Sequence, residues 1–191
     1  YFKGRRLNVF ASIDFAFSLS KKADFTAIVV VGVDGDNNYY ILDIDRFKTD
    51  SILEYFNRIL KMHQKWEFNK IRAEVSVAQQ VIVRDLKDNY IRKHGLFLSI
   101  DEYRPTRTKG TKEERVMAIL QPRYQNKQIW HYQGGYCQTL EEELILSNPS
   151  HDDVKDSLAS CIDLCVPPTI TGFLRRQMTN ILPHARFGGV A

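Results

Sequence analysis

Apolar residues follow two different periods along this chain, and the change of period separates expected strands from expected helices. Near the start the apolar positions are almost continuous or alternate, which predicts three strands at 7–17, 24–33 and 39–47. The segment 34–38 between the last two contains only Asp, Gly and Asn, residues that tolerate the positive φ of a tight turn. Consecutive strands joined in this way predict an antiparallel three-strand meander.

A helical period begins after residue 50. Apolar residues then recur at spacings of three and four, with Asp50 or Ser51 at the position of an N-cap. A short β-branched run at 70–77 predicts a fourth strand that contains Glu74. The pattern continues with an expected helix at 79–93 and a fifth strand at 96–100.

The remaining part of the chain is expected to be mainly helical. The apolar spacing predicts these elements: a helix at 112–120, a brief strand at 128–132, a helix from 139 to 146 and a helix at about 152–165. Thr139 and Glu142 have the spacing of a capping box, and Pro167 with Pro168 stops the last helix. The expected architecture is one α/β domain over 1–191, with a mixed central sheet, the antiparallel three-strand meander plus parallel strands, flanked by helices. Its core covers about 7–165, and an irregular tail covers 169–191.

Length and composition limit the class of protein. A chain of 191 residues has the size of one ordinary domain. No stretch approaches the roughly 18 consecutive apolar residues of a membrane span, and the start lacks the apolar stretch of a signal peptide. The protein is therefore expected to be soluble, not secreted and without a membrane partner. Cys137, Cys161 and Cys165 include no Cys-x-x-Cys pair, which argues against a disulfide framework and a structural zinc site.

The distribution of charge is more informative than its sum. A net charge of +4 does not by itself distinguish a nucleic-acid binder from any other basic enzyme. Basic residues gather at 104–112 and again around Arg175, Arg176 and Arg186, where few acids dilute them. These segments are compatible with contact to phosphate and equally with a solvated loop and tail.

Asp14, Glu74, Asp152 and Asp153 stand where the local pattern predicts an apolar residue or a helix cap. Each has an ordinary explanation when taken alone: the end of a strand, an open strand face, or a helix start favoured by the helix dipole. Taken together they come from elements that converge in an α/β sheet, and buried carboxylates repel one another unless cations lie among them. Mg²⁺ or Mn²⁺ suits such a group, and two ions can stabilise the attacking and leaving oxygens in phosphodiester hydrolysis.

Three motifs are similar to those of a known family. The strand 10–16 (FASIDFA) is followed by 21–27 (KKADFTA), 73–76 reads AEVS, and 151–159 reads HDDVKDSLA. In these motifs the chain resembles the nuclease domain of the large terminase subunit of tailed double-stranded DNA bacteriophages and herpesviruses, within the RNase H-like superfamily. The likeness runs from about residue 7 to 165, most of the chain, and it implies an RNase H-like fold.

The resemblance implies that Asp14, Glu74 and Asp153 hold metal and carry catalysis, with Asp152 as an additional or alternative ligand. Two Mg²⁺ or Mn²⁺ ions are the expected cofactors. Spacing alone does not choose within the third motif, because Asp156 lies four residues after Asp152 and three after Asp153, both on one helix face. Asp153 is ranked first, Asp152 second and Asp156 third. His151 is an accessory candidate that local contacts could equally satisfy.

The implied function is a metal-dependent endonuclease that cleaves double-stranded DNA during viral genome packaging, in the cytoplasm of the host cell. The implied partners are an ATPase motor domain, a small terminase subunit and a capsid portal. No Gly-x-x-x-x-Gly-Lys-[Ser/Thr] loop occurs in the sequence, so the motor is not expected within these residues. The candidate DNA contacts are Arg104, Arg107, Lys109, Lys112 and Arg115.

Two other functions are also compatible with the sequence. Another RNase H-like nuclease, such as a junction resolvase or an integrase, would use the same acids on DNA of a different geometry. A non-catalytic DNA-binding module would keep the acids for structure and use the basic loop for affinity.

Overall fold

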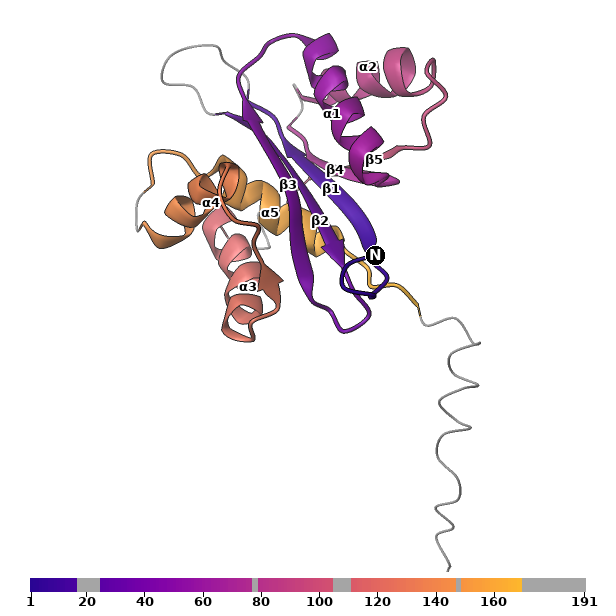
Figure 1. Ribbon diagram of the computed structural model, residues 1–191. Helices are drawn as coiled ribbons and strands as arrows, with labels where there is room; N and C mark the ends of the chain where they lie inside the picture. Colours follow the sequence, from indigo (N-terminus) through magenta and orange to yellow (C-terminus); the bar gives the residue numbers. More distant parts are fainter. Residues whose placement is uncertain (17–24, 77–78, 105–110, 147–148, 170–191) are drawn as a thin grey trace, which may run out of the picture.

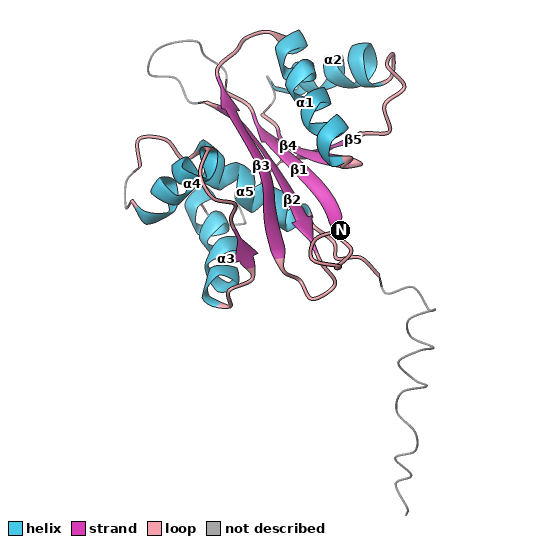
Figure 2. Cartoon of the chain, in the orientation of Figure 1, coloured by secondary structure: helices cyan, strands magenta, loops and turns pink. Residues whose placement is uncertain are grey.

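A computed structural model of the protein describes residues 1–16, 25–76, 79–104, 111–146 and 149–169. A twisted sheet forms the centre, and helices cover both of its faces (Figures 1 and 2). The predicted tail, apart from residue 169, lies outside the described residues, as do Arg107 and Lys109 of the basic loop and Lys21 and Lys22 of the first motif. No helix within the described ranges combines the length and the apolar character needed to cross a membrane.

The sheet has six strands in the order β5-β4-β1-β2-β3-β6. Its strands are β1 (Asn8–Asp14), β2 (Thr26–Val33), β3 (Tyr39–Phe47), β4 (Lys70–Glu74), β5 (Ser99–Tyr103) and β6 (Ile129–Trp130). β1, β2 and β3 pair antiparallel, whereas β4 runs parallel to β1, β5 parallel to β4, and β6 parallel to β3. The predicted mixed sheet, an antiparallel meander extended by parallel strands, is confirmed.

The helices divide between the two faces of the sheet. They are α1 (Ile52–Trp66), α2 (Gln79–Asp85), the π-helical η1 (Leu86–Ile91), α3 (Lys112–Gln125), α4 (Tyr136–Ile145) and α5 (Asp153–Leu164). Side chains of β2 alternate between two apolar clusters: Ile28 packs on the α1 side, and Val29 packs on the side of α3, α4 and α5. β2 is buried along its whole length, so its side chains stabilise the fold on both faces of the sheet. Each Å² of apolar surface that is buried contributes about 25 cal/mol to the free energy of folding.

Several predicted element ends are wrong by a few residues. β5 begins at Ser99 and not at residue 96, because its pairing starts where the Ser99 amide donates to the Asn69 carbonyl. The predicted helix 79–93 becomes a π-helix at Leu86 and ends at Ile91, and Gly95 follows it with a positive φ. β6 is limited to Ile129–Trp130, which pair only with the first residues of β3.

The predicted capping box at Thr139 and Glu142 is also wrong. α4 begins three residues earlier, at Tyr136, with Gly135 as its N-cap at φ 57°, a backbone conformation that favours glycine. A capping box is formed instead at α3, between Thr111 and Glu114. Of the two N-cap candidates for α1, Ser51 takes the position and accepts the Glu54 amide.

Candidate active site

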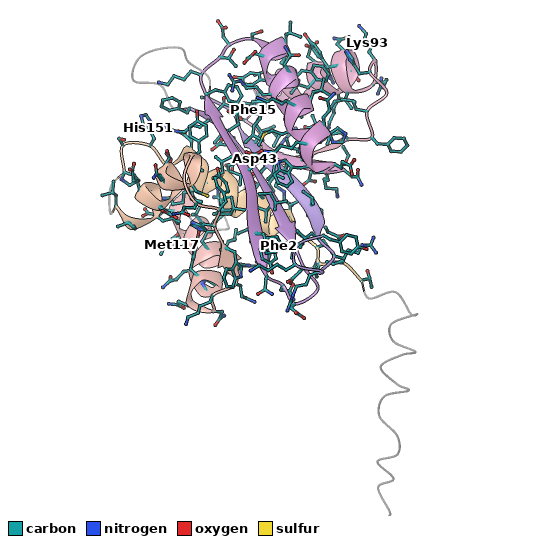
Figure 3. The ribbon with its side chains drawn as sticks, in the orientation of Figure 1. Phe2, Phe15, Asp43, Lys93, Met117 and His151 are labelled. Carbon is teal, nitrogen blue, oxygen red and sulfur yellow. The ribbon has the colours of Figure 1, made fainter. Side chains whose placement is uncertain are left out.

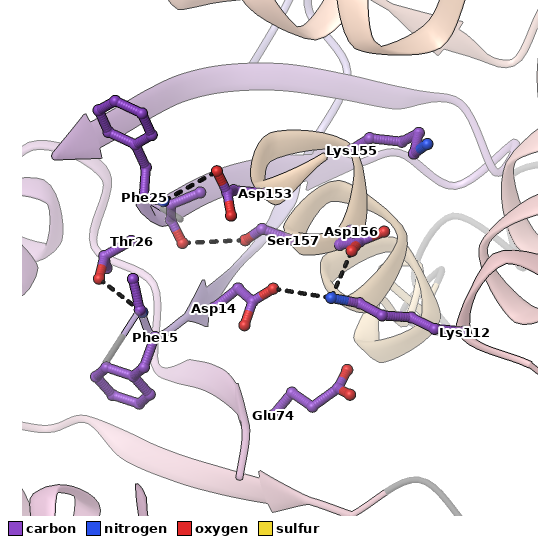
Figure 4. Close-up of polar contacts among 12 residues, drawn as sticks. Asp14, Phe15, Phe25, Thr26, Glu74, Lys112, Asp153, Lys155, Asp156 and Ser157 are labelled. Atoms are coloured by element: carbon purple, nitrogen blue, oxygen red, sulfur yellow. Dashed lines mark hydrogen bonds and ion pairs between the residues drawn. The ribbon is translucent and has the colours of Figure 1, made fainter. Parts of the chain in front are cut away.

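One row of paired residues crosses the sheet and positions two of the predicted acids. Asp14 pairs with Glu74 across the parallel strands β1 and β4, and with Ala27 across β1 and β2. Ala27 in turn pairs with Arg46 of β3. Directly paired residues project from the same face of a sheet. Asp14 and Glu74 therefore lie side by side at the carboxyl ends of their strands (Figure 4).

Helix α5 packs on this same face through small hydroxyl side chains. The Ser12 hydroxyl donates to the Ser157 carbonyl at 2.6 Å and lies 2.7 Å from the Ser157 hydroxyl. The Ser157 hydroxyl in turn lies 3.3 Å from the Ala27 carbonyl oxygen, to which it donates. Since Ala27 offers only a methyl group, the helix comes close to the strands, and its first turns bring Asp153 and Asp156 over the row that contains Asp14.

Lys112, the first residue of α3, connects two of these acids. Its ammonium lies 2.5 Å from Asp156 Oδ2 and 3.4 Å from Asp14 Oδ2 (Figure 4). Arg115, one turn further along α3, places Nη2 3.7 Å from Glu74 Oε1. The sequence predicted phosphate contacts for both cations, and here both lie against carboxylates. The start of α3 thus supplies positive charge to an acidic group formed by β1, β4 and α5.

Asp153 has different partners from Asp156. Its Oδ2 accepts the Phe25 amide at 3.1 Å and lies 3.6 Å from Arg46 Nη2. The Arg46 guanidinium also stacks over the Phe25 ring, 3.6 Å from its centroid. The sequence did not single out Arg46, because its place opposite Ala27 follows from a strand register that shifts at a bulge. Asp153 is therefore held by the residue that precedes β2 and by a side chain of β3.

The other two candidates of the third motif lie at its edge. Asp152 is exposed and takes the N-cap position of α5, but its side chain makes no capping hydrogen bond. The His151 ring packs edge-on against Phe25, with 5.1 Å between centroids. Figure 3 shows His151 near the start of α5, far from Lys93 on the α2 side of the molecule.

The electrostatics of the group show an excess of buried negative charge. Burial raises the pKa of Asp14 to about 7, the charge of Lys112 only partly opposes this, and the charges of Asp156, Glu74 and Asp153 add to it. Burial also raises the pKa of Asp156, again against the effect of Lys112. Burial would lower the pKa of Lys112, but the neighbouring carboxylates more than offset it and raise that pKa. The site thus favours a positive charge among its acids.

The donors of this group suit a hard divalent cation. Asp14, Glu74, Asp153 and Asp156 offer only carboxylate oxygens, the ligand type that Mg²⁺ and Mn²⁺ prefer. Among the described residues, no three His, Cys, Asp or Glu side chains form a cluster that could hold one ion, and Lys112 lies between two of the carboxylates. The chemistry of the donor set fits the predicted metals.

The predicted DNA contacts are only partly described. Arg104, just after β5, is exposed and lies 3.8 Å from Glu102 Oε2 through its Nη2 atom. Lys112 and Arg115 border a cavity of about 440 Å³ that also includes Glu74 and Asp156 in its lining. Lys112 and Arg115 therefore lie at an opening beside the acids.

Solved structures share this fold. The large terminase nuclease from thermophilic phage G20c superimposes with a TM-score of 0.62 and 15% identity over 84% of this chain and 83% of that chain. The same nuclease with bound magnesium gives a TM-score of 0.57 at 15% identity, over 84% of each chain. Fowlpox virus resolvase, in complex with its substrate Holliday junction DNA, gives 0.51 at 10% identity over 81% and 96%. Comparisons with protein-family models and with curated protein sequences find no match. The predicted RNase H-like fold is confirmed.

Proposed function

We propose that this RNase H-like chain is a metal-dependent endonuclease that cleaves double-stranded DNA. The observation that carries the proposal is the convergence of Asp14 and Glu74, paired across β1 and β4, with Asp153 and Asp156 of α5. Asp153 and Asp156 are buried and Asp14 and Glu74 are partly buried. Carboxylates gathered in this way are unfavourable for stability alone, since full removal of a carboxylate from water costs several kcal/mol. In a nuclease, a divalent cation would compensate the charge of these carboxylates and would bind the DNA phosphate.

Within this proposal the side chains have separate tasks. Asp14 and Glu74 would hold the cations with Asp153 or Asp156, and bound Mg²⁺ or Mn²⁺ supplies activation of water and charge neutralisation at the phosphate. Lys112 and Arg115 lie at the amino end of α3, where the helix dipole adds to their positive charge. Their position beside the acids suits them to hold a phosphate group of the DNA strand.

The finer role that we propose is cleavage of viral DNA during packaging. Support comes from the three sequence motifs and from the shared fold with the G20c terminase nuclease. The chain would then act as a single nuclease domain, within the host cell, together with an ATPase motor domain, a small terminase subunit and a capsid portal. The Mg²⁺-bound form of that nuclease supports magnesium as the cofactor.

A junction resolvase is the second candidate, because the fowlpox resolvase structure with its Holliday junction shares the fold. The substrate distinguishes the two: a resolvase cuts four-way junctions in preference to linear duplex. A strong junction preference, with inert duplex and plasmid, would reject the packaging role and retain the nuclease.

The decisive experiment incubates plasmid and linear duplex with the protein in Mn²⁺, in Mg²⁺ and in EDTA. Wild type and the isosteric variant Asp14→Asn are compared, with Asp88→Asn as the control, since Asp88 is an exposed acid on η1. We expect cleavage that needs divalent metal, is lost in Asp14→Asn and persists in Asp88→Asn. Cleavage that survives Asp14→Asn would reject this site, and DNA binding without cleavage would indicate a binding module.

A further inference from the structure

Helix α5 begins without a cap of its own. The first amides of a helix lack partners within it and need acceptors from elsewhere. Asp152 stands at the N-cap, yet its side chain makes no capping hydrogen bond. The amide of Lys155, the third residue of α5, donates instead to Oε2 of Glu143 at 2.8 Å. A carboxylate from α4 therefore caps the N-terminus of α5.

Glu143 occupies a position on α4 where an apolar residue is expected. The buried residues of that helix are Cys137, Leu140 and Glu143, spaced by three, and Glu143 is only 4% exposed. Burial raises the pKa of Glu143 to about 7, so its surroundings solvate the charge poorly. Its second oxygen, Oε1, has no hydrogen-bond partner among the described residues. Within the described ranges, the bond from the Lys155 amide is thus the only hydrogen bond of this buried carboxylate.

That hydrogen bond falls within the turn that bears the candidate metal ligands. Lys155 comes two residues after Asp153 and one before Asp156, so holding its amide fixes the turn to which both belong. In the same turn, Asp153 is held by Arg46 and by the Phe25 amide, and the charge of Arg46 also acts on Glu143. The start of α5 is therefore fixed from α4 and from the sheet at the same time.

We propose that Glu143 is a positioning residue, which caps α5 from α4 and thereby sets where Asp153 and Asp156 lie over Asp14. The consequence for metal binding rests on the proposed nuclease function, whereas the capping contact does not. Residues that orient metal ligands typically change metal affinity by 10- to 100-fold when they are replaced. A cap that served stability alone would leave the affinity of the folded protein unchanged.

The test uses three variants of Glu143 and one control. Glu143→Leu and Glu143→Ala remove the acceptor, and leucine keeps apolar volume on the buried face should the smaller alanine fail to fold. Glu143→Gln keeps a carbonyl oxygen for Lys155 and removes the charge. Glu142→Ala changes the exposed neighbouring acid of the same helix. Mn²⁺ affinity is measured by electron paramagnetic resonance, and exchange of the Lys155 amide by hydrogen–deuterium exchange, on samples shown to be folded.

We expect Glu143→Leu to bind Mn²⁺ about tenfold or more weakly and to exchange the Lys155 amide faster. Glu143→Gln should restore both to within a few-fold of wild type, and Glu142→Ala should match wild type. Wild-type Mn²⁺ affinity in folded Glu143→Leu, or a loss in Glu143→Gln equal to that in Glu143→Leu, would overturn the positioning role. If wild type binds no Mn²⁺ and cuts no DNA, the proposed function fails, and unchanged exchange at Lys155 would separately reject the cap.

Discussion

The ammonium of Lys112 lies 2.5 Å from Oδ2 of Asp156, an ion pair that joins the first turn of α3 to the first turns of α5. The same ammonium reaches Asp14 at the end of β1. One cation thus compensates two acids that burial makes unfavourable to ionise.

Replacing Lys112 with methionine should destabilise the metal-free protein. The variant keeps the apolar stem and removes the ammonium, which leaves Asp14 and Asp156 close together without their shared cation. Because the Lys112 side chain is 47% exposed, solvent screens part of the effect, and we expect a loss of about 1–2 kcal/mol at pH 8. Urea unfolding in EDTA measures this loss, with Lys61→Met, at an exposed position of α1, as the control. Equal stability of the two variants would contradict the prediction.

Replacing Asp14 with asparagine should stabilise the metal-free protein, and more so at high pH. The folded-state pKa of Asp14, about 7, lies above its ordinary value of 3.8, so the folded state holds this proton more tightly than the unfolded state. The contribution of Asp14 to stability is therefore lost as the pH rises from about 4 to 7. We expect a gain of about 1–3 kcal/mol at pH 8 that disappears near pH 4.

Urea unfolding of wild type and Asp14→Asn at a series of pH values in EDTA tests the direction of this pH dependence. A gain that grew toward low pH would contradict it. Saturating Mn²⁺ should reduce or reverse the difference, because an ion that binds only the folded wild type stabilises that form by mass action.

Asp34 should make stability depend on pH in the opposite sense. Burial alone would raise its pKa, but hydrogen bonds from Asn38, from the Asp36 amide and from the Tyr40 hydroxyl lower it to about 2. This contribution is present above about pH 4 and is lost as the pH falls toward 2. The cost of Asp34→Ala should therefore be about 2 kcal/mol larger at pH 7 than at pH 2. Unfolding curves at both pH values check it, with the exposed Asp50→Asn as control.

Enlarging Ala27 should displace α5 from the sheet. Ala27 is fully buried beneath α5, and its carbonyl accepts the Ser157 hydroxyl. Ala27→Leu should cost about 1–3 kcal/mol through overpacking and should also weaken Mn²⁺ binding, because the acids of α5 move away from Asp14. Ala11→Leu overpacks the opposite face of the sheet, so it should lose stability and keep its Mn²⁺ affinity. Equal Mn²⁺ affinities in the two folded variants would contradict this prediction.

The sequence by itself determined most of the elements, because their signals are local. The apolar periods predicted the meander, the strands that follow it and the final helix, and they placed Asp14 in the first strand and Glu74 inside the fourth. The predicted ends of helices and strands were less accurate where a backbone conformation decides the end. The positive φ of Gly135 lets α4 begin before Thr139, a choice that the side-chain pattern does not contain.

Only the tertiary structure decided which partners each acid of the third motif contacts. Asp153 and Asp156 are three residues apart on one helix, so local spacing treats them alike. Their partners come from distant parts of the chain: Arg46 from β3 for Asp153, and Lys112 from α3 for Asp156. The contribution of Glu143 is equally non-local, because it depends on α4 packing beside α5. Electrostatic environment depends on distance in space, which the order of residues in this sequence does not specify.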